Sequence, residues 1–541
     1  MVKSSQGLQT ALLSLCVSSA ILAQATPVAP PSPDAAACAA LSQLDLQRGV
    51  EAPARIITAR LVDVPAPPAR ATRESAAAVL AASPIAQYCE VTGYVAPQNK
   101  FELRLPLPKD WNQKFFFALC DGFCGAVQGN RCNASLARGY AAVTSNGGHD
   151  GAPGFDGIWA ANAPRLQEDF AFRSTHVVTV AAKAIVTKYY GRPIARSYVS
   201  GCSKGGQGAL MEVQRYPDDF DGAIAAAPVY DWTGQMTVST WFTQANSDGR
   251  GGLLLDSAAM HTVHASVLAA CGAQAGVDEG LVTDPAACAW RPERAACRTD
   301  APTAGCLTPQ QVAAVAKVLT RPNDAAGRDL YPAAFVPGAE TDAGFWFFGP
   351  GGARSLDISG HFLAAQQFLS FMAQPTSAGL VDPRRVDLAR LPRMLARARG
   401  LYDATSPDLR AFKARGGKLL MWHGLSDGAV PATSSVVYHD RVTRFMGGRA
   451  RTDDFFRLFL LPGVHHCAGG PGPDAVDAIT ALERWVEGGA APDELIARRV
   501  RNGVVERSRP AYPYPARARY SGSGDPMRAE SFVRADGAAR R

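Results

Sequence analysis

Short apolar runs alternate with helical patterns along much of this chain. Five apolar or β-prone runs, each followed by turn-forming residues, cover 114–119, 139–144, 197–200, 418–422 and 457–461. Between them lie segments with helical periodicity, such as 175–190 and 206–215. Strands that alternate with helices favour a mostly parallel sheet covered by helices. The pattern therefore predicts an α/β fold.

The middle of the chain, 233–415, breaks this alternation, because it is long, irregular and rich in Gly, Pro and Cys. It contains one well-capped helix start, with Thr308 as the cap, Pro309 in the first position and Gln311 in the third. It also contains an aromatic cluster at 345–348. We interpret 233–415 as a lid domain inserted between two parts of one core, 26–232 and 416–541, the second part with a C-terminal extension.

The N-terminal segment has the pattern of a secretory signal peptide over 1–25. Lys3 precedes an apolar stretch, and Ala23-Gln24-Ala25 offers a cleavage site between small residues. The alternative is an ordinary frayed helix. A lipid anchor on Cys16 is rejected because bulky Leu15 precedes it. No other run of about 20 apolar residues occurs, so we expect a secreted or periplasmic protein that does not span the membrane.

Export changes the interpretation of the cysteines. The chain has 12 Cys, and 11 would remain after loss of Cys16, which allows five disulfides and one thiol. A zinc site is disfavoured because no Cys-x-x-Cys occurs. The net charge of +7 is partly carried by Arg residues of the last 45 positions. We interpret these as solvated surface rather than as a nucleic-acid site.

Gly201-Cys202-Ser203-Lys204-Gly205 fits the motif Gly-x-Ser-x-Gly. It follows a β-prone run and precedes a helix-compatible one, which is the context of a nucleophile elbow. The glycines allow the sharp turn that projects the serine hydroxyl, and the helix N-terminus stabilises developing negative charge. We predict Ser203 as the nucleophile.

A nucleophilic serine needs a base, and the base needs an orienting carboxylate; in this fold they follow in the order Ser, Asp or Glu, His. Asp427 lies in the loop after the run 418–422, and His466 lies in the loop after 457–461. Three alternatives stay open for the base from the pattern alone: His423, His465, and His439 beside Asp440.

Two cysteines favour His466 over the other histidines as the base. Cys202 directly precedes the candidate nucleophile and Cys467 directly follows His466. If they pair, the disulfide would hold the nucleophile loop against the base loop, at a chain-entropy gain of about 5 kcal/mol.

The chain resembles the tannase and feruloyl esterase family, whose members carry a Cys-Ser, Asp, His-Cys arrangement with a disulfide between the cysteines. The matching residues are 202–203, 427 and 466–467, and similar stretches extend from 139–149 and 215–222 to 509–525. The resemblance implies an α/β-hydrolase core and a lid that shapes an aryl-ester pocket. It also implies an oxyanion hole formed by the backbone N–H groups of Lys204 and of a residue in 120–125, for which we favour Gly122.

Disulfides Cys38–Cys89, Cys271–Cys288 and Cys297–Cys306 follow from the same resemblance, the last two also from their short separations. A fifth should come from Cys120, Cys124 and Cys132, among which the sequence does not choose.

One family feature is degraded here. Family members commonly hold calcium in a lid loop, and the corresponding stretch, 272–281, has Gly272 and Ala275 where carboxylates are expected. Asp278, Glu279 and Asp284 remain as possible ligands around Val277 and Leu281, whereas calcium takes six to eight oxygens. We expect no firmly bound metal and no required cofactor. The family's C-terminal cysteine pair is replaced by Tyr512 and Arg534.

These observations predict a secreted serine esterase that hydrolyses small aromatic esters, galloyl, feruloyl or similar, through an acyl-enzyme. The alternatives are another exported α/β-hydrolase, either a lipase or a peptidase, and a non-catalytic binding protein on the same scaffold. No nucleic-acid or membrane partner is expected.

Overall fold

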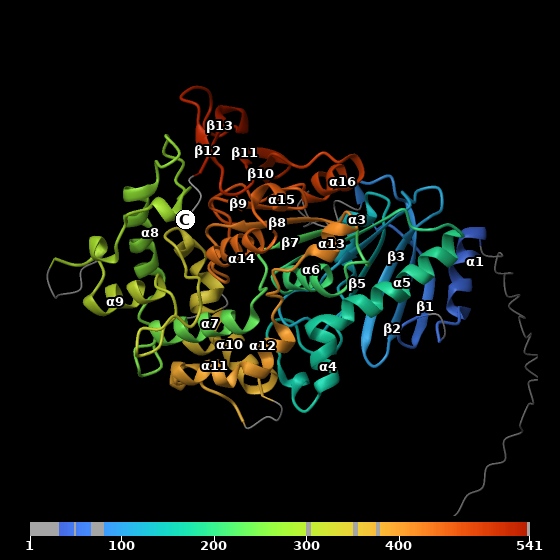
Figure 1. The fold of residues 1–541 in the computed structure, drawn as a ribbon, viewed down its shortest axis with the longest axis horizontal. Coiled ribbons are helices and arrows are strands. Elements are labelled where there is room, and N and C mark those ends of the chain that lie inside the picture. Colours follow the sequence, from blue (N-terminus) through green and yellow to red (C-terminus); the bar gives the residue numbers. More distant parts are fainter. Residues whose placement is uncertain are drawn as a thin grey trace, which may run out of the picture.

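The computed structural model describes residues 32–47, 50–65, 81–298, 305–349, 355–374 and 379–537 (Figure 1). The predicted signal peptide at 1–25 lies outside the described residues. Within them, no helix is long and apolar enough to cross a membrane.

A nine-stranded sheet organises the fold, in the order β1-β2-β3-β5-β4-β6-β7-β8-β9. The first three strands pair antiparallel, as do β3 and β5, and the six strands from β5 to β9 pair parallel. The bounds are β1 Ala54–Asp63, β2 Gln87–Val95, β3 Asn99–Pro106, β4 Lys114–Ala118, β5 Ala141–Ser145, β6 Arg196–Cys202, β7 Gly222–Ala226, β8 Lys418–Gly424 and β9 Phe456–Leu461.

Helices cover both faces of the sheet. The larger layer contains α1 Pro33–Ala40, α5 Ser174–Tyr190, α6 Lys204–Arg215, α13 Arg410–Ala414 and α14 Ala432–Phe445, and the opposite layer contains α16 Ala478–Gly488. Alternate side chains of one strand enter different layers. Phe115 and Phe117 of β4 pack with the α5–α6 side, and Phe116 packs with Trp485 of α16. This alternation follows from the two-residue repeat of a strand that is buried on both faces.

The expected core elements are confirmed. All five apolar runs form strands, as β4, β5, β6, β8 and β9, and the two helical patterns form α5 and α6. The capping box at Thr308 begins α9, Pro309–Val318. The mostly parallel α/β fold predicted from the sequence is therefore observed. The antiparallel strands β1 to β3 and the strand β7 were not among the predicted elements.

The segment 227–417, between β7 and β8, contributes no strand to the main sheet in its described part. It holds α7 Trp232–Ala245, α8 Ser257–Cys271, α9, α10 Gly360–Gln367, α11 Leu391–Met394, α12 Ala396–Tyr402 and α13. It has a hydrophobic cluster of its own, which includes Phe242, Phe335 and Phe347. In Figure 1 helices α7 to α12 lie together beside the carboxyl ends of the parallel strands. The chain rejoins the sheet core before 415, since Leu409 and Phe412 already pack there.

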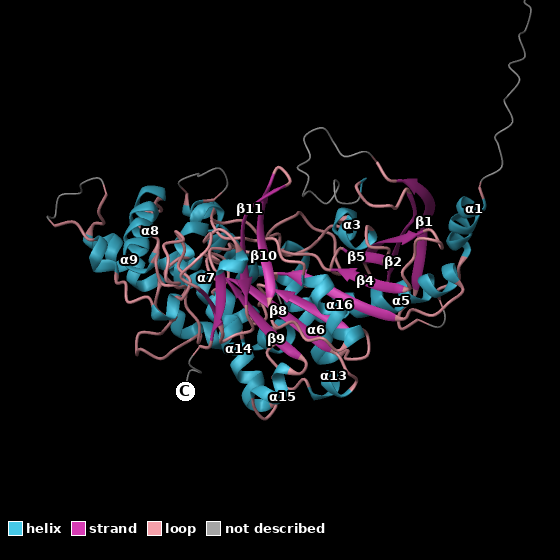
Figure 2. Cartoon of the chain, turned by 90° about the horizontal axis from the view of Figure 1, so that it is seen from above, coloured by secondary structure: helices cyan, strands magenta, loops and turns pink. Residues whose placement is uncertain are grey.

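The remaining short helices are α3 Asn133–Leu136, α4 Pro164–Glu168 and α15 Arg449–Asp453. The C-terminal extension forms two small antiparallel sheets, β10 Leu495–Arg501 with β11 Val504–Ala511, and β12 Arg517–Tyr520 with β13 Phe532–Ala535. Figure 2 shows the β10–β11 ribbon standing out from the strands of the main sheet. Arg509 and Arg507 of β11 reach the insertion, where both contact Glu279.

The described residues contain five disulfides, and these confirm the predicted pairs Cys38–Cys89, Cys202–Cys467, Cys271–Cys288 and Cys297–Cys306. The fifth is Cys120–Cys124, which leaves Cys132 as a buried thiol. Burial raises the pKa of Cys132 to about 12, so this thiol is unreactive in the folded protein.

Two buried carboxyl groups tie the ends of the insertion together. Asp231 precedes α7 and accepts from the Gly234 N–H at 2.7 Å, and Asp403 follows α12 and accepts from the Thr233 hydroxyl at 2.6 Å. Burial and the neighbouring Asp231 charge raise the pKa of Asp403 to about 8. The pair therefore holds one proton near neutral pH.

This proton makes stability depend on pH. Asp403 binds its proton more tightly in the folded state, so its contribution is complete below pH 4 and is lost as the pH rises through about 8. We expect the melting temperature of the wild type to fall by about 1 °C per pH unit over this window. In Asp403→Asn this slope should be shallower, which thermal unfolding from pH 5 to 9 measures. Equal slopes in the two proteins would contradict the shared proton.

Candidate active site

Ser203 occupies a sharp turn between β6 and α6. Its φ of 60° and ψ of −118° form a strained conformation for a residue with a side chain, as in a nucleophile elbow. The turn is held by backbone hydrogen bonds on both sides: the Ser203 N–H donates to Ala226 O at 3.0 Å, and its carbonyl accepts from the Val229 N–H at 3.1 Å.

The glycines of the motif are required by close approach. A Cβ on Gly201 would lie 2.5 Å from the Cα of Gly205, and a Cβ on Gly206 would lie 2.6 Å from Ala226 O. The helix therefore starts directly against the strand that precedes it and against β7. Ser203 therefore lies at the carboxyl end of β6, where the turn into α6 begins.

Asp427 and His466 lie in contact in the loops after β8 and β9. The His466 Nδ1 lies 2.7 Å from Asp427 Oδ2. Because a carboxylate only accepts, Nδ1 carries the proton in the neutral ring, and Nε2 keeps a lone pair. The two residues thus have the geometry of a base and its orienting acid.

Charge and hydrogen bonding shift the pKa values of Asp427 and His466 in opposite directions. Burial alone would raise the pKa of Asp427, but the charge of His466 and the hydrogen bonds from His423 and His466 hold it below its usual range. Burial would lower the pKa of His466, but the same carboxylate raises it. An anionic Asp427 therefore favours protonation of His466, as a general base requires.

The other candidate histidines face elsewhere. His423 is fully buried, between Asp427 Oδ2 at 3.0 Å and the Ser435 hydroxyl at 2.7 Å. His465 contacts the Thr341 hydroxyl of the insertion at 3.0 Å, and His439 packs against Phe456. Of these four histidines, His466 is the one that lines a pocket with Ser203.

The disulfide Cys202–Cys467 joins the neighbours of Ser203 and His466, with their Cα atoms 5.8 Å apart. It links loops 265 residues apart in the chain. The Ser203 hydroxyl and the His466 ring form no hydrogen bond in this structure, a common situation before substrate binds. The disulfide keeps the two side chains at one pocket nonetheless.

This pocket is mostly aromatic and apolar. The core and the insertion line it together. Its walls contain Gly122, Phe123, Phe155, Ser203, Val229, Trp232, Gln235, Met236, Ser239, Trp346, His361, Ala364, Ala429, Val430 and His466. Trp346 stands edge-on to the His466 ring, with the centroids 5.3 Å apart. A larger, apolar pocket lies between the insertion and the C-terminal extension, but neither Ser203 nor His466 lines it.

Both backbone groups predicted for an oxyanion hole lie near Ser203. Lys204 is the first residue of α6, so its N–H has no acceptor within the helix. Gly122 lines the pocket, in a loop that the Cys120–Cys124 disulfide closes. Its φ is +59° and a Cβ there would lie 2.8 Å from Gly154 O, so the position admits only glycine. The Lys204 side chain turns away and donates to Gln207 at 2.8 Å.

Sequence reasoning did not find Asp342, which the insertion contributes. Its Oδ2 accepts from the N–H groups of Gly428 and His466, each at 3.0 Å. Burial and the charge of Asp427 raise the pKa of Asp342 to about 6. An isolated Asp in an irregular segment gives no signal in a single sequence, because its partners lie 86 and 124 residues away.

The residues of the degraded calcium loop are paired with the protein's own cations. Glu279 accepts from Arg509 Nε and Nη2, both at 3.0 Å, and its carbonyl accepts from Arg507 at 2.9 Å. Asp284 pairs with Arg517, and Asp278 accepts from the Gly280 N–H at 2.9 Å. Calcium requires several free oxygens. This donor set does not fit a calcium site.

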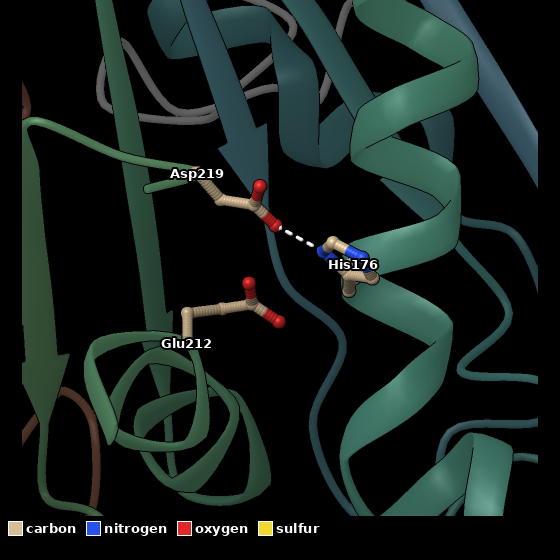
Figure 3. A group of neighbouring side chains, drawn as sticks. All are labelled: His176, Glu212 and Asp219. Carbon is tan, nitrogen blue, oxygen red and sulfur yellow. Dashed lines mark hydrogen bonds and ion pairs between the residues drawn. The ribbon is translucent and has the colours of Figure 1, made fainter. Parts of the chain in front are cut away.

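His176, Glu212 and Asp219 form the single cluster of three potential metal ligands among the residues that the structure describes (Figure 3). His176 Nδ1 lies 2.6 Å from Asp219 Oδ2, whereas donors on one tetrahedral zinc ion lie about 3.3 Å apart. Burial, followed by the Asp219 charge, raises the pKa of Glu212 well above its usual range. A Glu212 carboxyl group that keeps its proton is a poor metal ligand, so the cluster does not fit a metal ion.

Comparison with known proteins agrees with this architecture. The family model described as tannase and feruloyl esterase matches residues 83–535. A mono(2-hydroxyethyl) terephthalate hydrolase of Piscinibacter sakaiensis is 32% identical over 521 residues, covering 84% of this chain and 86% of that protein. A probable feruloyl esterase B-2 of Aspergillus terreus is 29% identical over 465 residues, covering 81% and 84%.

Solved structures show the same fold. Feruloyl esterase B from Aspergillus oryzae superposes with a TM-score of 0.79 at 24% identity, over 93% of this chain and 100% of that one. Tannin acyl hydrolase from Aspergillus niger superposes with a TM-score of 0.75 at 20% identity, over 94% and 96%. The fold and its relatives define a carboxylic ester hydrolase of the α/β-hydrolase type. The chain belongs to the tannase and feruloyl esterase family.

Proposed function

We propose that this protein is an exported serine esterase that cleaves aromatic carboxylic esters through an acyl-enzyme. The observation that carries the proposal is the shared pocket of Ser203 and His466, with His466 Nδ1 bonded to Asp427 at 2.7 Å. The five disulfides support export to an oxidising compartment.

In this mechanism Ser203 Oγ attacks the ester carbonyl and His466 Nε2 takes its proton. The carbonyl oxygen becomes an oxyanion, which the N–H groups of Lys204 and Gly122 stabilise. His466 then gives the proton to the departing alcohol, leaving an acyl group on Ser203. His466 takes a proton from a water molecule, and the resulting hydroxide attacks this acyl group. Collapse of the second oxyanion releases the acid, and Ser203 Oγ takes the proton back from His466 as it leaves.

The aromatic acyl group is supported by the pocket walls. Phe123, Trp232 and Trp346 offer ring faces and edges to a bound ring. The names of the relatives, a terephthalate monoester hydrolase and probable feruloyl esterases, point to the same class of substrate. A lipase would instead need a long aliphatic surface, whereas aromatic side chains form much of the wall of this pocket.

We also propose that the protein needs no calcium, because guanidinium groups hold the remaining carboxylates of the loop. The buried Glu279 is compensated by Arg509 and Arg507, so a divalent cation would have to displace a protein cation.

The first test is hydrolysis of a panel of methyl gallate, ferulate and benzoate esters beside aliphatic esters of equal length. We expect the aryl esters to be cleaved with the higher kcat/KM. Ser203→Ala should lower kcat by at least about 10³-fold and abolish labelling by a fluorophosphonate probe, at an unchanged melting temperature. A variant that kept a tenth of the wild-type rate would overturn the assignment.

The adjacent histidines provide a matched pair of variants. His466→Ala should lower kcat about as far as Ser203→Ala, because triad members act as a unit. His465→Ala removes a contact with Thr341. It should lower kcat by about tenfold at most, because it disturbs only the packing of the loop. Asp427→Asn should also lower kcat steeply, because an amide in place of the carboxylate favours the wrong tautomer of His466. An inactive His465→Ala beside an active His466→Ala would show that the base is misassigned.

The calcium proposal is tested by thermal unfolding with and without a chelator. We expect the melting temperature to change by less than about 2 °C, since no divalent cation contributes to folding. Arg509→Met is the contrasting variant: it leaves Glu279 buried with a weaker partner and should destabilise the fold by about 3–5 kcal/mol. A chelator effect of many degrees in the wild type would show that other oxygens complete a metal site.

A further inference from the structure

A short 3₁₀ turn of the insertion, Ala339–Asp342, meets both loops of the proposed triad. Asp342 Oδ2 accepts from the N–H of Gly428, in the loop that follows β8, and from the N–H of His466, each at 3.0 Å. A Cβ on Gly428 would lie 2.8 Å from Asp342 O, so the turn packs directly against the first of these loops. A single carboxylate oxygen of the insertion therefore joins the loop of the acid, Asp427, to the base itself.

The hydrogen bond to Asp342 fixes the backbone of His466 and not its ring. The ring is held separately, with Nδ1 2.7 Å from Asp427 Oδ2, and the next residue is held by the Cys202–Cys467 disulfide. His466 is thus fixed at three points, of which the insertion supplies one. Catalysis is sensitive to such points, because a shift of about 1 Å in a reacting group can lower the rate about 100-fold.

The carboxylate of Asp342 also acts on His466 through its charge. Its side chain is 15% exposed, so water screens this charge only partly. Burial lowers the pKa of His466, whereas the Asp427 carboxylate and then the charge of Asp342 raise it above its ordinary value of 6.5. Because burial and the Asp427 charge raise the pKa of Asp342 only to about 6, His466 takes its proton while Asp342 is still largely ionised. The imidazolium formed in the reaction therefore lies near two anions.

The other titratable groups around this pair have partners of their own. Glu340, on the same turn, is paired with His264 Nδ1 at 2.9 Å. His465 Nε2 lies 3.0 Å from the Thr341 hydroxyl, and its Nδ1 lies 3.5 Å from Asp342 Oδ1. Burial lowers the pKa of His465, so that ring is neutral when the base titrates. Charges that reach the site from other elements come from Asp121, His361 and His423. Of the two acidic residues on the turn, Asp342 is therefore the one that contacts the catalytic loops.

We propose that Asp342 is a positioning residue for the general base, which it holds by the backbone while its charge stabilises the protonated ring. The inference rests on the proposed function and deepens it, since the insertion then takes part in the chemistry of Ser203 and His466 as well as in the pocket wall. Asp342 touches no reacting atom and acts through His466.

Two substitutions separate the charge of Asp342 from its hydrogen bonds. Asp342→Asn keeps an oxygen that can accept from both N–H groups and removes the charge, whereas Asp342→Ala removes the acceptor and the charge together. The experiment measures kcat and KM from pH 5 to 9 with the aryl ester that the wild type cleaves fastest. In both variants the acid limb of kcat/KM should move to lower pH by about 0.5–1 unit, because the base has lost a neighbouring anion.

The two variants should differ in kcat. Above the acid limb, Asp342→Asn should lower kcat by about three- to tenfold and Asp342→Ala by about 30- to 100-fold, because only alanine frees the backbone of His466. KM should stay within about threefold of the wild type in both, since Asp342 does not line the pocket. A contact that served only to stabilise the fold would lower the melting temperature without moving the acid limb.

Thr341→Val is the matched control. Thr341 lies on the same turn, and its hydroxyl contacts His465 rather than His466. This variant should keep the acid limb of the wild type and a kcat within about threefold of it.

A fluorophosphonate probe measures the same limb without any ester, because its reaction with Ser203 also needs the base. An acid limb of Asp342→Asn within about 0.2 unit of the wild type overturns the role of Asp342, whatever the loss in kcat. If the probe labels the wild type but no aryl ester of the panel is cleaved, the proposed substrate class fails. The probe's limb then decides on Asp342 alone, since a shift to lower pH supports its role and an unchanged limb overturns it. A wild type that neither reacts with the probe nor cleaves an ester overturns both proposals.

Discussion

The buried carboxylate of Asp427 organises the proposed active site, because an ion removed from water must have its oxygens satisfied by the protein. Its Oδ1 accepts from the N–H groups of Ala429 and Val430, both at 2.8 Å, and its Oδ2 accepts from His466 and His423. Satisfying this charge therefore does two things at once. It orients the ring of His466, and it folds the loop 427–430 into a tight turn around the carboxylate.

The carbonyls of that turn are thereby fixed as well, and each has a partner in the site. Gly428 O sets the tautomer of His361, and Ala429 O sets the orientation of the Gln235 amide. Val430 O lies 3.2 Å from His423 Nε2. The loop that satisfies the acidic member of the proposed triad therefore also fixes two polar side chains of the pocket wall, His361 and Gln235.

The insertion also contacts the two loops that carry Asp427 and His466. Asp342 accepts from the backbone of both catalytic loops, at Gly428 and at His466. A Cβ on Gly428 would lie 2.8 Å from Asp342 O, so the close contact requires a glycine there. Trp346 then covers the His466 ring. The insertion therefore acts on the site through positions that touch the turn after β8, in addition to the pocket wall of α7.

Residues within local motifs could be predicted from the sequence, whereas residues that depend on distant partners could not. Ser203, Asp427 and His466 could be predicted as site residues because local motifs surround them, and the strand runs around them are long or apolar enough to stand out. Strand β7 was missed because its sequence, Gly-Ala-Ile-Ala-Ala, has little β-propensity. Small residues are needed there, since a Cβ on Gly222 would lie 2.9 Å from Leu482.

Asp342, Gln235 and His361 have no such motif, and each acts through partners 67 to 194 residues away. A single sequence carries no trace of such distant pairings. Because the triad is encoded locally and the pocket wall is encoded by distant contacts, the wall can change in α7 and α10 while Asp427 and its turn stay intact. The turn supplies fixed carbonyls at Gly428 and Ala429 to the side chains that α10 and α7 place against it.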